Sequence, residues 1–340
     1  MWSLPRRGQA DFLLTKKQPI PPMAQDENAA LAHIYQFTGV GTEYSRVSLQ
    51  PSLQWIMAAA ILVVTWSAFL FGRSRGHRPA AANSVSGQSA RLWGELFQKD
   101  RDTFLVPADS GLVILEGLTR ASVPLTQYAG GDYKQVPGAV GSGLTSPVVQ
   151  QLSTRRYTSI VDLSLVSQIS RLPKVVPERL LIRYARDLRM DDLRSSNAIL
   201  LGSVDSNPWE ELFEQQLNFR FQFDPKQDTA PVIENMHPLP GEEPMYANCR
   251  HGEWHNTFGI IAFVPNLSGT GHILIAGGLN MAGTQAAGDF LLNASLMNPV
   301  LERASRPDGT LRPFEILVTT DNIAANASRP HVVSERIGAL

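Results

Sequence analysis

A stretch without any charged side chain runs from residue 47 to residue 72. Its apolar centre, Leu53–Phe71, is 19 residues long. At about 1.5 Å of rise per helical residue, this length matches the hydrocarbon core of a bilayer, which is about 30 Å thick. Trp55 and Trp66 lie towards its two ends, where tryptophan favours the boundary between lipid and water. The pattern predicts one transmembrane helix over residues 47–72 and makes the lipid bilayer the first expected partner.

Two other interpretations of this stretch fit the pattern less well. A signal peptide begins near residue 1 and has a shorter apolar run, whereas 46 mostly polar residues come first here. A buried core helix of this length usually carries more polar residues on one face than Gln54, Thr65 and Ser67. We therefore expect a single-pass membrane protein.

The charges beside the expected span indicate its orientation. Within about 20 residues of the span, Arg46 is the only basic residue on the N-terminal side, whereas Arg73, Arg75 and Arg78 follow on the other. Basic residues are enriched on the cytoplasmic side of membrane spans. The charges thus lean towards a cytoplasmic location for the larger part of the chain.

The segments on either side of the span are poor in apolar periodicity. Residues 1–46 contain four prolines that interrupt helices, together with scattered charges, and are expected to be largely disordered. Residues 73–90 are mostly small and polar, which is typical of a flexible linker. Globular patterning begins at Arg91.

Beyond Arg91, strand-like and helix-like patterns alternate along the chain. Helices are predicted near 92–97, 109–118, 157–169, 190–193, 209–215 and 283–291, and strands near 102–107, 179–184, 197–202, 218–224, 258–264, 272–277 and 314–320. The run 197–202 is almost continuously apolar, as in a buried parallel strand. We expect an α/β fold with a mainly parallel sheet flanked by helices, arranged as two lobes, 91–190 and 191–340.

Composition excludes some classes of protein and leaves others open. The 340 residues carry a net charge of -1, so no basic surplus indicates a nucleic-acid partner. The single cysteine, Cys249, excludes an intrachain disulfide framework. Neither the glycine spacing of a dinucleotide fingerprint nor a phosphate-binding loop is present, and no cofactor is expected.

Two strand-to-helix turns, 200–209 and 275–284, are the main candidates for a ligand site. Ligands of open α/β sheets gather at the carboxyl ends of strands, and helix N-termini attract anions. If the two strands are parallel neighbours, both turns face one crevice, which would suit a small polar or anionic ligand. In the alternative interpretation these residues only form turns and cap helices. The candidate residues are Ser203, Ser206, Asn207, Gly278, Asn280, Gly283 and Thr284.

A third turn, 107–111, adds Asp109 and Ser110 to the candidate ligand-binding residues. Both residue types are favoured at helix N-termini, so capping of the following helix is the first interpretation. The alternative is a hydrolase in which Ser110 is the nucleophile, with Asp109 and a histidine as the other triad members. The elbow pattern Gly-x-Ser-x-Gly is absent, which weighs against the hydrolase.

Two further clusters carry chemistry-bearing side chains. Cys249, His251 and His255 are weak candidates for a metal site, because the zinc-protease order His-Glu-x-x-His is not met and no fourth ligand is apparent. A polar loop before the strand at Phe258 is the favoured interpretation of this segment. Arginines and aspartates alternate over residues 179–194, which is typical of a solvated, ion-paired face or of a site for an acidic partner.

Several stretches together resemble a group of uncharacterised bacterial proteins that carry a soluble α/β domain on one membrane span. They are Asn197-Ala-Ile-Leu-Leu-Gly-Ser, Asn207-Pro-Trp-Glu-Glu-Leu-Phe-Glu and the glycine-rich segments within 269–291. The resemblance covers about residues 91–335 and brings no catalytic residues. Some members have a helix-turn-helix domain before the span, but residues 1–46 here are too short and proline-rich for one. At the level of fold alone, the chain is loosely similar to periplasmic solute-binding proteins.

These observations predict a membrane-anchored, sensor-like protein whose α/β domain binds a small polar or anionic ligand, or a protein partner, without catalysis. A membrane-anchored hydrolase or metal-dependent enzyme is the first alternative. A structural or assembly component of a membrane complex is the second.

Overall fold

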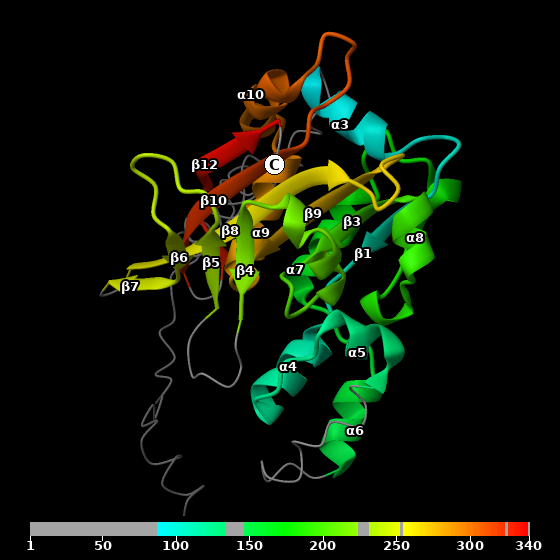
Figure 1. Cartoon of the computed structure of the whole chain (residues 1–340), viewed down its shortest axis with the longest axis vertical. Coiled ribbons are helices and arrows are strands. Elements are labelled where there is room, and N and C mark those ends of the chain that lie inside the picture. Colours follow the sequence, from blue (N-terminus) through cyan, green and yellow to red (C-terminus); the bar gives the residue numbers. More distant parts are fainter. Residues whose placement is uncertain (1–86, 133–145, 224–230, 252–253, 324–325, 339–340) are drawn as a thin grey trace, which may run out of the picture. The chain divides into compact units, whose positions relative to one another are not determined.

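A computed structural model describes residues 87–132, 146–223, 231–251, 254–323 and 326–338 (Figure 1). The expected disordered segment 1–46, the expected span 47–72 and most of the expected linker lie outside these residues. Within the described part of the chain, no helix is both long and apolar enough to cross a bilayer.

Helices and strands are both found along the described region, but the described strands between residues 219 and 278 follow one another without a helix between them. The helices are α3 (Gln88–Leu96), α4 (Ser110–Thr119), α5 (Leu125–Gly130), α6 (Ser146–Thr154), α7 (Ile160–Ile169), α8 (Met190–Ser195), α9 (Met281–Leu292) and α10 (Ala294–Ala304), with 3₁₀ turns η3 (Pro177–Arg179), η4 (Ala185–Asp187), η5 (Pro208–Leu212) and η6 (Glu214–Gln216). The strands are β1 (Thr103–Val106), β2 (Leu180–Ile182), β3 (Asn197–Leu201), β4 (Phe219–Gln222), β5 (Val232–Asn235), β6 (Met245–Ala247), β7 (Cys249–His251), β8 (Trp254–Pro265), β9 (His272–Gly278), β10 (Phe314–Ile323), β11 (Asn326–Ala327) and β12 (His331–Ile337).

The main sheet is mixed, with a parallel core. Its strand order is β11-β10-β8-β9-β3-β1-β2, with β12 paired to β10 and β7 paired to β8. The neighbours β9, β3, β1 and β2 are parallel, whereas β8, β10 and β12 extend the sheet by antiparallel pairing. A separate antiparallel sheet contains β4, β5 and β6. The α/β class is confirmed, and the sheet is mixed rather than mainly parallel.

Strands from both expected lobes lie side by side in the main sheet. β3, from the expected second lobe, pairs in parallel with β1, from the expected first lobe, through the register Phe104↔Ala198 and Leu105↔Ile199. Residues Pro79–Leu340 form one compact unit. The boundary expected at residues 190 and 191 therefore does not divide the domain.

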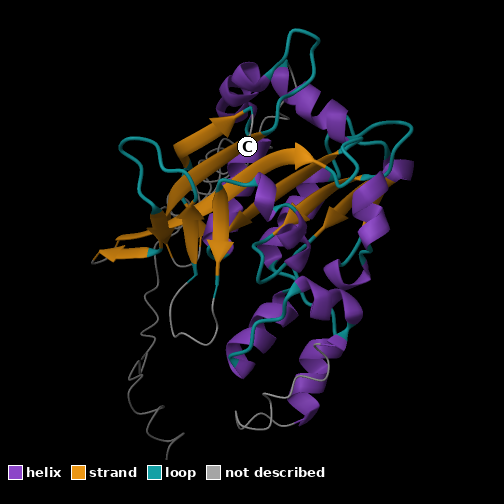
Figure 2. Cartoon of the chain, in the orientation of Figure 1, coloured by secondary structure: helices purple, strands orange, loops and turns teal. Residues whose placement is uncertain are grey.

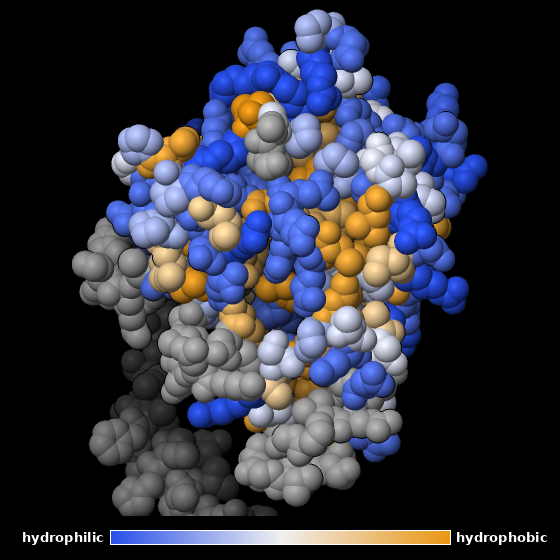
Figure 3. Space-filling model, in the orientation of Figure 1, coloured by the Kyte–Doolittle hydropathy of each residue, from blue (hydrophilic) through white to orange (hydrophobic). Residues whose placement is uncertain are grey.

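Alternate residues of the central strands enter two apolar layers, one on each face of the sheet. All five residues of β3 are buried, with Ala198 and Leu200 on one face and Ile199 and Leu201 on the other. Helices α4, α5, α6 and α8 and the small sheet contribute to the first layer, and α3, α7, α9 and α10 contribute to the second (Figure 2). Figure 3 shows hydrophobic side chains near the middle of one face, within a largely hydrophilic rim.

Two helices differ from the prediction, one in where it begins and one in its type. Helix α3 begins at Gln88, inside the expected linker, because Ser89 is buried and donates to Asn298 Oδ1 from its backbone N (2.9 Å) and from Oγ (2.6 Å). The helix expected over 209–215 is instead two 3₁₀ turns, η5 and η6. Strand β12 and the small sheet around β5 are further elements that the pattern did not predict.

Candidate functional site

The carboxyl ends of β1, β2, β3 and β9 share one edge of the main sheet, because these four strands are parallel. β3 and β9 are direct neighbours, with Leu200 opposite Ile275, so the turns that follow them lie on the same edge, as expected. The chain leaves β1 towards β2 on one side and leaves β3 towards β9 on the other. This divergence between neighbouring strands is a topological switch point, where α/β sheets commonly hold ligands.

Asp109 occupies this switch point and is fully buried. Its Oδ1 accepts from Leu112 N (3.1 Å), Tyr184 Oη (2.5 Å) and Arg186 Nη2 (3.0 Å), while Oδ2 accepts from Arg186 Nε (2.5 Å) and Tyr128 Oη (3.1 Å). The bond from Leu112 N confirms that Asp109 caps α4. The carboxylate is thereby enclosed by donors from α4, α5 and the segment that follows β2.

Both tyrosines of this network donate to the Asp109 carboxylate. Burial raises the pKa of both Tyr128 and Tyr184, so each phenol stays protonated and donates to the carboxylate. Arg186 also donates to the carbonyl oxygens of Leu152 (3.0 Å) and Ser153. No described histidine bonds to Asp109, so this carboxylate does not form the Asp–His half of the triad considered for Ser110.

The turn after β3 is held together by its own polar groups. Ser206 Oγ accepts from Ser203 N (3.0 Å) and donates to Ser203 O (2.9 Å), while Ser206 O accepts from Asp109 N (2.7 Å). Asn207 lies at the expected capping position but its side chain makes no capping bond. Its Nδ2 instead donates inward to Leu201 O (3.1 Å), and the residue is fully buried. The prediction that the Asn207 side chain caps the following helix was therefore wrong.

The helix that follows β9, α9, is capped by Asn280 and not by Thr284. Asn280 Oδ1 accepts from Gly283 N (2.9 Å) and from Thr257 Oγ1 (3.1 Å), which makes Asn280 the N-cap of α9. Thr284 lies within the helix and is largely buried, so its expected capping role was also wrong.

The backbones of these two turns approach each other closely. A Cβ atom added at Gly277 would lie 1.7 Å from Gly202 O, and one added at Gly278 would lie 2.2 Å from the carbonyl carbon of Gly283. Gly202 itself has a φ of 99°, in the region that favours glycine. The polar and glycine residues that the sequence singled out therefore lie close together. Their described contacts are with each other and with the backbone at the carboxyl ends of the parallel strands.

Two buried glutamates, Glu116 and Glu210, have raised pKa values. Burial, together with repulsion from Asp205, Glu211 and Asp109, raises the pKa of Glu116 to about 8. Burial also raises the pKa of Glu210 well above its usual range. Since Glu116 Oε2 and Glu210 Oε1 have no hydrogen-bond partner, the neutral carboxyl form is the one these sites favour.

The weak metal candidates lie in a β-hairpin rather than in a loop. β7 and β8 pair with Cys249 opposite Asn256 and His251 opposite Trp254. The side chains of Cys249, His251 and His255 are outside the described residues. Within the described part of the chain, no three histidine, cysteine or acidic side chains are placed to hold a metal ion.

Most of the alternating charges over 179–194 form ion pairs near the surface. Arg179 contacts Asp102 (3.0 Å), and Arg183 contacts Asp192 (2.7 Å). Arg186 is the exception, because it pairs with buried Asp109 and its side chain is only 9% exposed. The alternating charges therefore predicted the ion-paired surface, but they did not predict that Arg186 is buried and pairs with Asp109.

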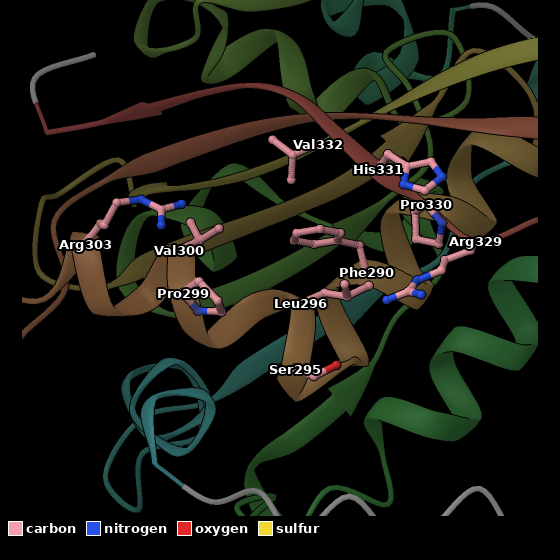
Figure 4. A pocket seen from close by; sticks show the side chains of 10 residues that line it. All are labelled: Phe290, Ser295, Leu296, Pro299, Val300, Arg303, Arg329, Pro330, His331 and Val332. Carbon is pink, nitrogen blue, oxygen red and sulfur yellow. The ribbon is translucent and has the colours of Figure 1, made fainter.

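An open groove of about 430 Å³ lies on another part of the domain, between α10 and the start of β12. Figure 4 shows its side chains, with Arg303 at one end, Arg329 and His331 at the other, and Phe290 and Val332 between them. The lining residues are Phe290, Ser295, Leu296, Pro299, Val300, Arg303, Arg329, Pro330, His331 and Val332. We call this site the α10–β12 groove.

The lining of the α10–β12 groove has an arginine at each end and apolar side chains in its middle. The described residues that line it include two arginines and one histidine but no aspartate or glutamate. Arg303 pairs with Glu335 (2.5 Å). Arg329 is exposed and has no ion pair with any residue that the structure describes. An anionic group would find an unneutralised guanidinium there.

Two backbone irregularities shape this groove. Pro299 lies inside α10 and has no N–H, so the carbonyl of Ser295 lacks its usual helical donor. In β12 the register to β10 shifts: Val332 pairs with Val318 and Ser334 with Leu317, which leaves Val333 as an extra residue. Such a bulge re-aims side chains. Val332 accordingly lines the groove beside α10, while Ser334 faces the loop that carries Glu242.

Sequence reasoning missed the α10–β12 groove, although it left local signals. A proline within an otherwise helical run, at Pro299, and an Arg-Pro-His-Val-Val segment at 329–333 were both readable. Their meeting depends on the pairing of β12 with β10, which no local pattern indicates.

No protein-family model matches the chain, and neither the curated proteins nor the solved structures searched contain a match. The resemblance to membrane-anchored bacterial proteins thus stays a prediction from the sequence.

Proposed function

We propose that this chain is a membrane-tethered binding protein whose α/β domain takes an anionic ligand or an acidic partner in the α10–β12 groove, without catalysis. The tether is the apolar stretch 47–72. The observation that carries the proposal is Arg329, which has no ion pair with any described residue and lies in a groove whose described lining has arginines and apolar groups but no acid. Hydrogen bonds between charged groups are among the stronger polar contacts that a protein surface offers.

The described features of the carboxyl edge support the absence of catalysis. Asp109 is surrounded by donors, and the turn residues bond to one another or to nearby backbone. A ligand there would have to displace contacts that hold β1, β3 and β9 together. The α10–β12 groove can receive a ligand without such a rearrangement.

Thermal unfolding of the full-length protein in lipid nanodiscs tests the proposal. The scan would include dicarboxylates, phosphate esters and acidic peptides, with their cationic counterparts as controls. A ligand that binds only the native state at 100 times its Kd contributes about 2.7 kcal/mol of stability, which corresponds to roughly 5–10 °C in Tm for a domain of this size.

A matched pair of variants assigns any such effect to the groove. Arg329→Gln should abolish most of the stabilisation by anionic ligands. Arg155→Gln should leave it unchanged, because Arg155 is also exposed but follows α6, on the opposite face of the sheet. If no anionic compound raises Tm, or if both variants respond as the wild type does, the proposed function is wrong.

A further inference from the structure

On the basis of the proposed function, we infer that the ligand of the α10–β12 groove is an extended peptide segment. The segment would have an acidic group near one end, which meets Arg329, and an apolar side chain next to it. It would lie between the exposed first half of β12 and helix α10. Charge, length and backbone chemistry each support this choice.

The length of the groove sets the length of the segment. Its wall on α10 runs from Ser295 to Arg303, a separation of eight residues or about 12 Å at helical rise. An extended peptide covers about 3.3 Å per residue, so about four residues span the wall. An acidic group at one end of such a segment would meet Arg329, while the other end would lie beside Arg303, which already pairs with Glu335 (Figure 4).

The middle of the groove suits an apolar side chain. Phe290, Leu296 and Val332 lie between the two cationic ends in Figure 4. Val332 is 45% exposed, so burying it against an apolar partner is favourable. Because Glu335 already pairs with Arg303, the uncompensated positive charge lies at the Arg329 end, and the complement of the groove is an acidic group next to an apolar side chain.

Backbone groups favour a peptide over other anions. Ser295 lines the groove, and its carbonyl points along the helix towards Pro299, which cannot supply an N–H. A peptide brings N–H donors that satisfy this acceptor, whereas a phosphate group or a simple dicarboxylate does not.

The strand wall of the groove also fits an extended peptide. β12 lies beside β10 at the end of the sheet, and residues 331–333 are exposed. The following half of β12 is held by the loop at Glu242, through Arg336 Nη1 (2.9 Å) and Ser334. Exposed strand edges recruit extended peptides by backbone hydrogen bonding, with pockets beside the edge reading alternate side chains.

Peptide selection on the full-length protein tests the inference. A random heptapeptide library is displayed on phage and selected on the protein in neutral phosphatidylcholine nanodiscs. Affinities of the selected peptides are then measured by fluorescence anisotropy for the wild type, Arg329→Gln, Arg155→Gln and Pro299→Ala. In parallel, vesicles containing phosphatidylserine are tested for binding to the same proteins.

We expect the selected peptides to contain an acidic residue next to an apolar one. Arg329→Gln should weaken their binding about ten-fold or more, while Arg155→Gln should not change it. Pro299→Ala restores the helical donor to Ser295 and should weaken peptide binding several-fold, even though it removes a proline from a helix interior and so raises Tm. An N-methyl group on the peptide N–H that bonds Ser295 should weaken binding to the wild type but not to Pro299→Ala.

The outcomes separate this inference from the proposed function. If no acidic peptide is selected, or if the selected peptides bind Arg329→Gln as tightly as the wild type, the peptide inference is overturned. Binding of phosphatidylserine vesicles or of a small dianion that is lost in Arg329→Gln would then keep the proposed function and assign the groove to another anion. If the wild type binds neither acidic peptides nor any other anion, both the peptide inference and the proposed function are overturned.

Discussion

Replacing Arg186 by methionine should be among the most damaging single changes in the domain. Methionine keeps much of the side-chain volume but leaves the Asp109 carboxylate buried without its counter-charge. Removing one partner of a buried ion pair typically costs 3–5 kcal/mol. Here we expect about 3 kcal/mol, because Leu112 N and the two tyrosine hydroxyls still donate to the carboxylate.

The partner residue provides the matching half of a double-mutant cycle. Asp109→Asn keeps a good helix-capping residue but removes the charge that neutralises Arg186. The double variant leaves neither charge unpaired, so it should cost less than the sum of the two single changes. A favourable coupling of about 1–3 kcal/mol is expected for residues in one such network.

Urea unfolding of the full-length protein, followed by circular dichroism, measures these differences. A loss of about 3 kcal/mol is a large part of the 5–15 kcal/mol that stabilises a typical domain, and it should lower Tm by roughly 6–12 °C. The reasoning is refuted if Arg186→Met costs less than about 1 kcal/mol, or if the double variant shows simple additivity.

Three further predictions concern packing, pH and the membrane. Gly277→Ala should cost about 3 kcal/mol or more, since its Cβ would collide with Gly202 O, whereas Gly94→Ala, with open space around it, should stabilise helix α3 by about 0.5–1 kcal/mol; urea midpoints compare the two. Glu116 has a folded pKa of about 8, above its unfolded value of 4.5, so its neutral form favours folding and this contribution is lost as pH rises from 4.5 through 8. Glu116→Gln should therefore be near neutral at pH 5 and stabilising at pH 9, and equal effects at both pH values would contradict this. Deleting Leu53–Phe71 should release the protein from membranes after carbonate extraction, and the membrane proposal fails if the full-length protein is already soluble.

The elements that sequence predicted well are those whose signals are local. The apolar run of β3 indicated a buried parallel strand, and Asp109 indicated a helix cap, because both depend on a few consecutive residues. The hairpin of β8 and β9 was likewise visible as two apolar runs around a turn. The shared edge for the turns after β3 and β9 followed from the same reasoning.

The features that sequence did not predict depend on distant partners. Arg186 lies 77 positions from Asp109, and its neighbours are ordinary surface arginines. Asparagine is favoured at helix N-termini, but the side-chain amide of Asn207 donates to the carbonyl of Leu201 instead of capping a helix. The α10–β12 groove requires the bulge at Val333, which exists only because β12 pairs with β10.

Hydrogen–deuterium exchange of the full-length protein, with and without an anionic ligand identified by thermal unfolding, tests the central claim most directly. The exchange of backbone amides reports which segments a ligand protects. The account predicts protection at 295–303 and 329–333, with little change at 202–209 and 277–284. Protection confined to 202–209 and 277–284 would contradict it and would place the ligand at the carboxyl edge of the parallel strands instead.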